Sequence, residues 1–286
     1  MTDGEPSRRL TAFRRDGLAF TVRDDGPIDG PVVIALHGFP QTSASWAAVT
    51  PHLVEAGYRV LAPDQRGYAA GARPQDVRSY AMASLAADVL ALADAAGAAR
   101  FHLLGHDWGA AVSWWLAGRR AERVASLSAV SVPHPAALRR ALAGTQLLRS
   151  WYIGAFQVPW LPERLLRVRG GVLARRLLVG TGMRDTAPAV RLLSDPRTAT
   201  GALGWYRAIR RRGQLDAGRT RVPTLFVWSD GDTALGRRAA EGAVRYVRGP
   251  YRFEVLHGAS HWIPEERPAE LAALVLEHLA AHPIPG

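Results

Sequence analysis

The sequence of 286 residues predicts an α/β protein with a mostly parallel central sheet, flanked by helices and interrupted by a helical insertion. Two observations support this fold class. Strand-like apolar runs alternate with segments of helical spacing, as in parallel sheets whose crossover helices cover both faces. The alternation stops at about Ala136 and resumes after about Arg221, with no strand-like run between them. We therefore expect a discontinuous core, residues 1–135 and 222–286, with residues 136–221 forming a helical cap.

The expected strands are short runs of aliphatic and β-branched residues that end at turn signals. They cover residues 18–22, 32–36, 58–62, 101–104, 124–132, 224–228 and 251–256. The expected core helices carry apolar residues at helical spacing, and glycines such as Gly57 and Gly97 mark their ends. They cover residues 50–57, 82–96, 110–116, 237–247 and 268–281. Ligands of such sheets bind beyond the carboxyl ends of the strands, where the motifs described below fall.

The composition is that of an ordinary globular protein, with 48% hydrophobic and 21% charged residues. There is no cysteine, which excludes disulfides, thiolate metal sites and a cysteine nucleophile. All 36 basic side chains are arginine, so the absence of lysine excludes Schiff-base chemistry. No asparagine occurs either, and no role can rest on an asparagine side chain.

The first 13 residues are polar and charged and lack the apolar stretch of a signal peptide. No window reaches the ~18 uninterrupted apolar residues that would cross a bilayer. We therefore expect a cytoplasmic protein without a membrane span. A homo-oligomer is left open, because the sequence does not determine the oligomeric state.

A glycine-flanked aspartate follows one expected strand, in the sequence G-H-D-W-G at residues 105–109. The pattern has the form glycine, any residue, nucleophile, any residue, glycine. Such a strand-to-helix turn is too crowded for larger flanking side chains, and it aims the next backbone N–H at the reacting centre. Asp107 occupies the nucleophile position, which predicts an aspartate nucleophile. The competing interpretation is a carboxylate that only caps the following helix.

Further motifs accompany this pattern in a fixed order along the chain. They are H-G-F-P at residues 37–40, D-Q-R-G-Y at 64–68, S-D-G-D at 229–232 and G-A-S-H-W at 258–262. In this order and spacing the chain resembles the epoxide hydrolases and haloalkane dehalogenases of the α/β-hydrolase fold. The resemblance extends over essentially the whole chain from about Phe20. It implies that fold, with an inserted helical cap, and no metal or organic cofactor.

The resemblance implies covalent catalysis through Asp107. A carboxylate is ionised at neutral pH, with a reference pKa near ~3.9, and can displace a leaving group from an sp3 carbon without a base. The product is an ester of the protein, which water must hydrolyse with the help of a general base. The tetrahedral oxyanion needs N–H donors. The family places these at Phe39 and Trp108, and it suggests a cis Phe39–Pro40 peptide.

Among nine histidines, His261 is the best candidate for the base, because it follows the last strand and its loop resembles the family's base loop. His257 is the fallback. Asp232 is the expected orienting carboxylate, which would hold the imidazole tautomer, and Asp230 is the alternative. His37 lies at the carboxyl edge of the sheet and is expected to line the substrate pocket.

His134 also lies at the carboxyl edge of the sheet and is expected to line the substrate pocket.

Epoxide opening expels an alkoxide, and a tyrosine, whose pKa is near ~10, can donate a hydrogen bond or proton to it at neutral pH. Tyr152 and Tyr206 lie in segments of the insertion that resemble the two cap tyrosines of epoxide hydrolases. Their neighbours Trp151 and Trp205 are expected in the pocket. The structural alternative is that these aromatics only pack inside the cap.

We therefore predict an epoxide hydrolase that converts a small, largely apolar epoxide and water into a vicinal diol. The nearest alternative is a haloalkane dehalogenase with the same machinery, in which tryptophans such as Trp108 would bind halide. A non-catalytic ligand-binding homologue and a nucleic-acid-binding protein, suggested by the isoelectric point of about 11.0, are less favoured.

The positive charge is concentrated in the expected cap. Residues 136–221 hold 17 arginines and four acidic residues, a net charge of +13, whereas the remainder of the chain carries −2. This uneven distribution argues against nucleic acid as a general partner. The simplest interpretation is that the arginines line solvated helix faces. The alternative is that the basic cap faces an acidic partner, an anionic surface or an anionic substrate group.

Overall fold

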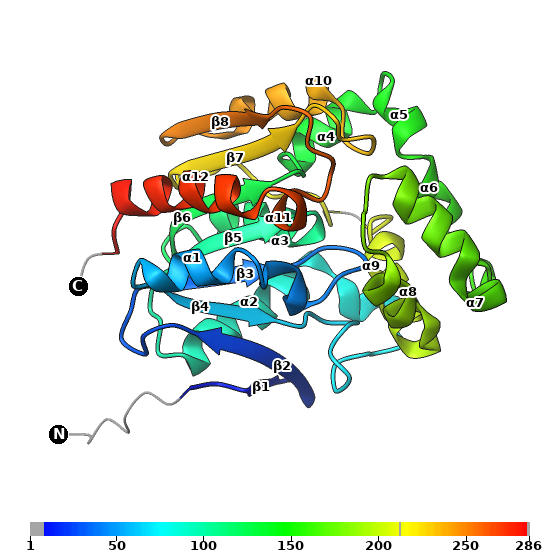
Figure 1. The fold of residues 1–286 in the computed structure, drawn as a ribbon, viewed down its shortest axis with the longest axis horizontal. Coiled ribbons are helices and arrows are strands. Elements are labelled where there is room, and N and C mark those ends of the chain that lie inside the picture. The colour runs from blue at the N-terminus through cyan, green and yellow to red at the C-terminus, as the bar shows by residue number, and fades with distance from the viewer. Residues whose placement is uncertain (1–8, 212, 285–286) are drawn as a thin grey trace.

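The computed structural model describes residues 9–211 and 213–284. Its centre is a sheet of eight strands in the order β1-β2-β4-β3-β5-β6-β7-β8 (Figure 1). β1 and β2 pair antiparallel, β2 pairs antiparallel with β4, and every further pair is parallel. The strands are β1 (Ala12–Arg15), β2 (Leu18–Asp25), β3 (Val32–Leu36), β4 (Arg59–Pro63), β5 (Phe101–His106), β6 (Val124–Val130), β7 (Thr224–Ser229) and β8 (Tyr251–Leu256).

Helices connect the parallel strands and cover both faces of the sheet. Those of the sheet-bearing part are α1 (Thr50–Glu55), α2 (Met82–Ala95), α3 (Trp108–Arg119), α10 (Arg237–Glu241), α11 (Ile263–Glu266) and α12 (Pro268–Ala281). Three short 3-10 helices accompany them: η1 (Ser43–Trp46), η2 (Val77–Tyr80) and η3 (Gly242–Tyr246). Between β6 and β7 lie α4 (Pro135–Ala141), α5 (Gln146–Arg149), α6 (Trp151–Ala155), α7 (Leu161–Gly180), α8 (Ala187–Ser194) and α9 (Pro196–Ala208).

The sheet has two buried faces, because side chains alternate along each strand. In β3, Ile34 and Leu36 join the apolar cluster that contains α2 and α3. Val33 and Ala35 face the opposite cluster, which contains α1 and α12. All five residues of β3 are buried, which explains why this strand reads as a continuous apolar run.

The sequence-based elements agree with the structure except at several ends. Strands 32–36 and 251–256 and helix 268–281 have the predicted bounds. The predicted helix 237–247 is instead a short α-helix followed by the 3-10 helix η3. The edge strand β1 was not predicted, because only one of its four residues is buried and it has no apolar pattern.

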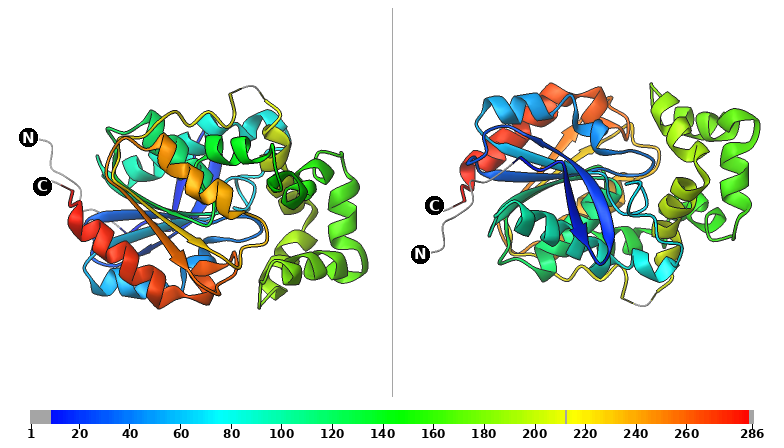
Figure 2. Two further views of the ribbon diagram at one scale, coloured as in Figure 1. Left: turned by 90° about the horizontal axis from the view of Figure 1, so that it is seen from above. Right: turned by 90° about the horizontal axis from the view of Figure 1, so that it is seen from below.

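The helices α6–α9 lie at one end of the sheet, beyond the ends of β3 and β5, whereas α4 packs beside α10 and η3 of the sheet-bearing part (Figures 1 and 2). The C-terminal end of α12 lies on the opposite side of the molecule from α6–α9 (Figure 1). All elements from α4 to α9 are helical, as predicted for this part of the chain. Among the helices of the described ranges, none combines the length and apolarity that a membrane crossing needs.

Candidate active site

Asp107 lies at the sharp turn between β5 and α3. Its φ is +52° and its ψ −119°, a conformation that residues other than glycine rarely adopt. A Cβ on Gly109 would lie 2.0 Å from the Leu36 carbonyl oxygen, and one on Gly105 would lie 2.5 Å from the Gly109 carbonyl oxygen. The two glycines are therefore required for the turn, and the turn places Asp107 at the carboxyl edge of the sheet.

The Asp107 carboxylate receives one backbone N–H and faces one imidazole. Phe39 N–H donates to Asp107 Oδ1 at 2.8 Å, and the Phe39–Pro40 peptide is cis, as the resemblance suggested. His261 Nε2 lies 3.5 Å from Asp107 Oδ2. Burial raises the pKa of Asp107, but His261 and the Phe39 N–H outweigh burial and hold that pKa below its usual value. The carboxylate is thus ionised and one of its oxygens is held in place.

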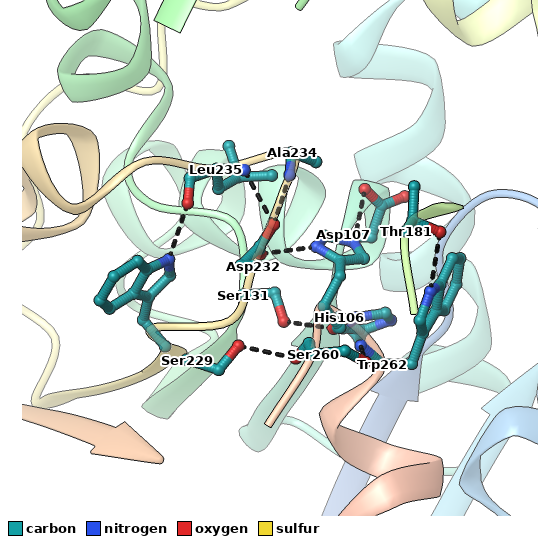
Figure 3. Close-up of polar contacts among 12 residues, drawn as sticks. His106, Asp107, Ser131, Thr181, Ser229, Asp232, Ala234, Leu235, Ser260 and Trp262 are labelled. Atoms are coloured by element: carbon teal, nitrogen blue, oxygen red, sulfur yellow. Dashed lines mark hydrogen bonds and ion pairs between the residues drawn. The ribbon is translucent and has the colours of Figure 1, made fainter. Parts of the chain in front are cut away.

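His261 is held between two carboxylates. Its Nδ1 lies 2.7 Å from Asp232 Oδ2, and both side chains are almost fully buried. Asp232 Oδ1 accepts the backbone N–H groups of Ala234 and Leu235 at 2.7 and 2.8 Å (Figure 3). Burial lowers the pKa of His261, but Asp232 and Asp107 outweigh burial and raise it to about 10. The resting imidazole is therefore protonated near neutral pH.

The alternative histidine and aspartate form a separate pair on the surface. His257 Nδ1 lies 2.7 Å from Asp230 Oδ2, and the His257 side chain is 79% exposed. The structure thus brings His261 and Asp232 to Asp107 and leaves His257 and Asp230 outside.

Polar contacts to backbone fix the loop that carries His261. Ser131 Oγ donates to the His261 carbonyl oxygen at 2.8 Å, and His106 Nε2 lies 2.9 Å from the same oxygen (Figure 3). Ser229 Oγ donates to the Ser260 carbonyl oxygen at 2.6 Å. His106 is fully buried, and burial lowers its pKa to about 4. His106 is therefore neutral and supports the loop.

Tyr152 of α6 and Tyr206 of α9 lie close together, with ring centroids 6.0 Å apart. Burial raises the pKa of both phenols, and the negative charge of Asp107 raises it further. Both hydroxyls therefore keep their protons at neutral pH. Tyr206 also meets Phe39 and Trp108 edge to face, at centroid distances of 5.2 and 5.1 Å.

Two cavities, of about 370 and 470 Å³, meet at these residues. Asp107, Tyr152 and Tyr206 line both of them. The smaller is walled mainly by aliphatic side chains, including Val132, Leu138, Leu142, Ile153, Ile209 and Leu215. The larger is lined among others by Phe39, Leu148, Trp151, Phe156, Leu177, His261 and Trp262. A largely apolar molecule can therefore place a reacting carbon at Asp107 and extend to either side.

Trp108 and Trp151 each line one of the two cavities. Trp108 lines the smaller cavity and begins α3, so its backbone N–H is one of the helix's first amides, which have no partner within the helix. Trp151 lines the larger cavity and is otherwise exposed.

His37, His134 and Trp205, which were expected to line the substrate pocket, do not line either of these two cavities. His37 is fully buried and its Nδ1 lies 2.9 Å from the Gly38 carbonyl oxygen. His134 Nε2 lies 2.9 Å from the Gly218 carbonyl oxygen. Trp205 Nε1 donates to a backbone carbonyl at 2.8 Å. The polar atoms of these three side chains are thus engaged with backbone carbonyl groups.

Sequence reasoning missed two side chains that hold the loop after β7. Gln146 is buried; its Oε1 accepts the Gly236 N–H at 2.9 Å and its Nε2 donates to the Ala234 carbonyl oxygen at 2.7 Å. Arg149 Nη1 donates to the Asp232 carbonyl oxygen at 2.9 Å. Both are polar residues in a short helix of the insertion, and no sequence motif marks them. Within the described ranges, no cluster of three or more potential metal-ligating side chains occurs.

Comparison with known proteins agrees with this geometry. The profile of the alpha/beta hydrolase fold family matches residues 31–268. Epoxide hydrolase A of Mycobacterium tuberculosis is 36% identical, over 96% of this chain and 98% of its own. The AB hydrolase superfamily protein YfhM of Bacillus subtilis is 34% identical, over 92% and 95%. The crystal structure of epoxide hydrolase A from Mycobacterium thermoresistibile superposes with a TM-score of 0.80 at 29% identity, covering 96% and 98% of the two chains.

The chain belongs to the α/β-hydrolase fold family. Within it, the chain falls in the group that contains the named epoxide hydrolases, as the sequence motifs indicated. This membership supports an epoxide hydrolase function.

Proposed function

We propose that this protein hydrolyses an epoxide to a vicinal diol through a covalent ester on Asp107. The observation that carries the proposal is the aspartate at the strained turn after β5, which faces the His261–Asp232 pair on one side and lines two apolar cavities with Tyr152 and Tyr206. We further propose that residues 136–221 act as the cap, because they supply both tyrosines.

In the first step, Asp107 Oδ2 attacks an epoxide carbon and the C–O bond of the ring breaks. Oδ1 stays on the Phe39 N–H and becomes the ester carbonyl oxygen. The departing oxygen takes a proton from Tyr152 or Tyr206, whose raised pKa values keep them protonated until that moment. The product is a hydroxyalkyl ester of Asp107 and one tyrosinate.

Ester formation changes the protonation of His261. The resting imidazolium is stabilised by two carboxylates, and the ester removes the charge of Asp107 while Asp232 remains. The pKa of His261 therefore falls when the ester forms. His261 gives up one proton and the tyrosinate takes up one proton. The tyrosine is thereby restored, and His261 becomes a neutral base.

In the second step, His261 takes a proton from water, and the hydroxide attacks Cγ of Asp107. The oxyanion forms on Oδ1, where the N–H groups of Phe39 and Trp108 hold it. Collapse of the tetrahedral intermediate breaks the bond between Cγ and Oδ2 and releases the diol. The diol oxygen that was Oδ2 takes the proton of the new carboxyl group. Asp107 is again a carboxylate and His261 an imidazolium, which closes the cycle.

Isotope labelling tests this sequence of steps. In a single turnover in 18O-water, the diol should carry no label and Asp107 should gain it, because the diol oxygen comes from Oδ2. Further turnovers should pass label into the diol. Label in the diol of the first turnover would refute covalent catalysis, and an equally active Asp107→Asn variant would do the same. Halide release from haloalkanes without diol formation from epoxides would favour the dehalogenase alternative.

A further inference from the structure

Exposed apolar side chains are concentrated on one segment of the inserted helices. Of the twelve large apolar residues that are exposed in the described ranges, eleven lie in residues 147–179. They are Leu147, Leu148, Trp151, Val158, Trp160, Leu161, Leu165, Val168, Val172, Leu173 and Val179. We call these residues, with the arginines described next, the α5–α7 surface. Such a concentration of exposed apolar side chains in one segment is typical of surfaces that bind another molecule or a membrane.

The α5–α7 surface is also basic. Five exposed arginines of α7 lie among the apolar residues: Arg164, Arg167, Arg169, Arg175 and Arg176. Within the described part of the chain, none of these five arginine side chains has a hydrogen bond or an ion pair. The one acidic residue of α7, Glu163, is buried and bound by Arg207. The positive charge of this surface is therefore uncompensated.

The surface lies at the outer edge of the molecule. α6 and α7 form the edge of the molecule farthest from the sheet (Figures 1 and 2). α7 consists of two helical pieces joined by the non-helical residues 168–171, and each piece buries part of its surface, Leu166 in the first and Ala174 and Leu178 in the second. Helices with one buried side and a basic, apolar outer side can lie flat against another surface without rearranging the core.

The larger cavity at Asp107 reaches this same surface. Leu148, Trp151 and Arg176 belong to the α5–α7 surface and also line that cavity. An apolar substrate held in a phase that contacts the α5–α7 surface would therefore reach the cavity directly.

We propose that the α5–α7 surface binds the surface of an anionic lipid bilayer. Arginines attract anionic headgroups, and exposed leucine, valine and tryptophan side chains can enter the boundary between headgroups and acyl chains. Trp151 and Trp160 are 60% and 65% exposed, and tryptophan favours that boundary. Since no described helix can cross a membrane, the protein would lie on the bilayer. This binding does not depend on epoxide chemistry.

A second copy of the chain fits this surface less well. A two-fold dimer places the same patch of both subunits in contact. The five uncompensated arginines of one subunit would then face those of the other, and like charges across an interface oppose association. An anionic bilayer supplies the opposite charge and an apolar phase together.

Vesicle flotation tests the proposal. The full chain should float with vesicles of equal parts phosphatidylglycerol and phosphatidylcholine, much less with phosphatidylcholine alone, and less at high salt. Each basic residue near an anionic membrane contributes about a fivefold gain in partitioning, so Arg164→Gln/Arg167→Gln/Arg169→Gln should lower it about 100-fold. The matched control, Arg14→Gln/Arg23→Gln/Arg248→Gln, removes the same charge from exposed sites outside the surface and should bind within a few-fold of wild type.

A second set of variants tests the apolar part. Trp160→Gln/Leu165→Gln/Val172→Gln should also abolish most flotation, whereas Val244→Gln, at the one exposed large apolar residue outside the segment, should not. Thermal unfolding of each variant checks that it is folded. Equal binding to neutral and anionic vesicles, equal loss in the control triple variant, or a dimer in lipid-free solution that the Trp160 triple variant dissociates would each overturn the proposal.

Discussion

Replacing Asp232 by asparagine should separate the two chemical steps. The substitution keeps the shape of the side chain but removes the charge that holds His261 as a protonated, oriented imidazole at 2.7 Å. In the proposed mechanism, attack on the epoxide uses Asp107, whose hydrogen bond from Phe39 is untouched by the substitution. Hydrolysis of the ester, in the same mechanism, needs His261 as a base. We therefore expect the ester to form and then persist.

The size of the effect follows from the burial of the pair. Asp232 has no exposed side-chain surface, and His261 only 5%. Removing one partner of a buried, hydrogen-bonded charge pair costs about 3–5 kcal/mol, and ~1.4 kcal/mol corresponds to tenfold in rate. If most of this cost appears in the hydrolytic transition state, ester hydrolysis should slow by about 10²–10⁴-fold. Ring opening should change much less.

The assay is intact-protein mass spectrometry after rapid mixing with an epoxide. The Asp232→Asn variant should gain the mass of one substrate on Asp107 and lose it slowly. Asp230→Asn is the matched control, because it makes the same chemical change in the exposed pair with His257 and should behave as wild type. The reasoning is refuted if no ester accumulates in Asp232→Asn, or if Asp230→Asn slows hydrolysis equally.

Four further substitutions test the tyrosines, the imidazolium and the loop contacts. Tyr152→Phe and Tyr206→Phe should each slow ring opening by about 10²-fold without ester accumulation, because each removes one donor to the leaving oxygen. Pre-steady-state kinetics measures both steps, and slower ester hydrolysis in place of slower ring opening would contradict this role. The pKa of His261 is raised to about 10, so its stabilising pairing is complete below the unfolded value of ~6.5 and is lost as pH rises toward 10. The free energy of unfolding of wild type should therefore fall over that range relative to His261→Gln, and parallel curves would contradict the ionised pairing. Gln146→Leu leaves the Gly236 N–H unpaired and should destabilise the protein by about 1–3 kcal/mol in chemical denaturation, with lowered activity; unchanged stability would show that the contact is dispensable.

The sequence by itself predicted the α/β fold with its inserted helices and the sharp turn that carries Asp107. The glycine-flanked pattern of residues 105–109 predicted a crowded nucleophile turn. The structure gives the physical reason, because a Cβ on Gly109 would lie 2.0 Å from the Leu36 carbonyl oxygen. Continuous apolar runs predicted strands buried on both faces, and the break after residue 135 predicted the inserted helices. These features are local, since each depends on the residues of one turn, strand or segment.

Only the tertiary structure decided which polar residues meet Asp107. His37, His134 and His261 all lie at the carboxyl edge of the sheet, but ring nitrogens of the first two contact backbone carbonyls, while His261 lies between two carboxylates. Gln146 showed no signal, because its partners are some 90 residues away in sequence and its role depends on how the inserted helices pack on the β7 loop. The sequence fixes which side chains are available at an edge, and side-chain packing and hydrogen bonding between distant segments select those that reach the site.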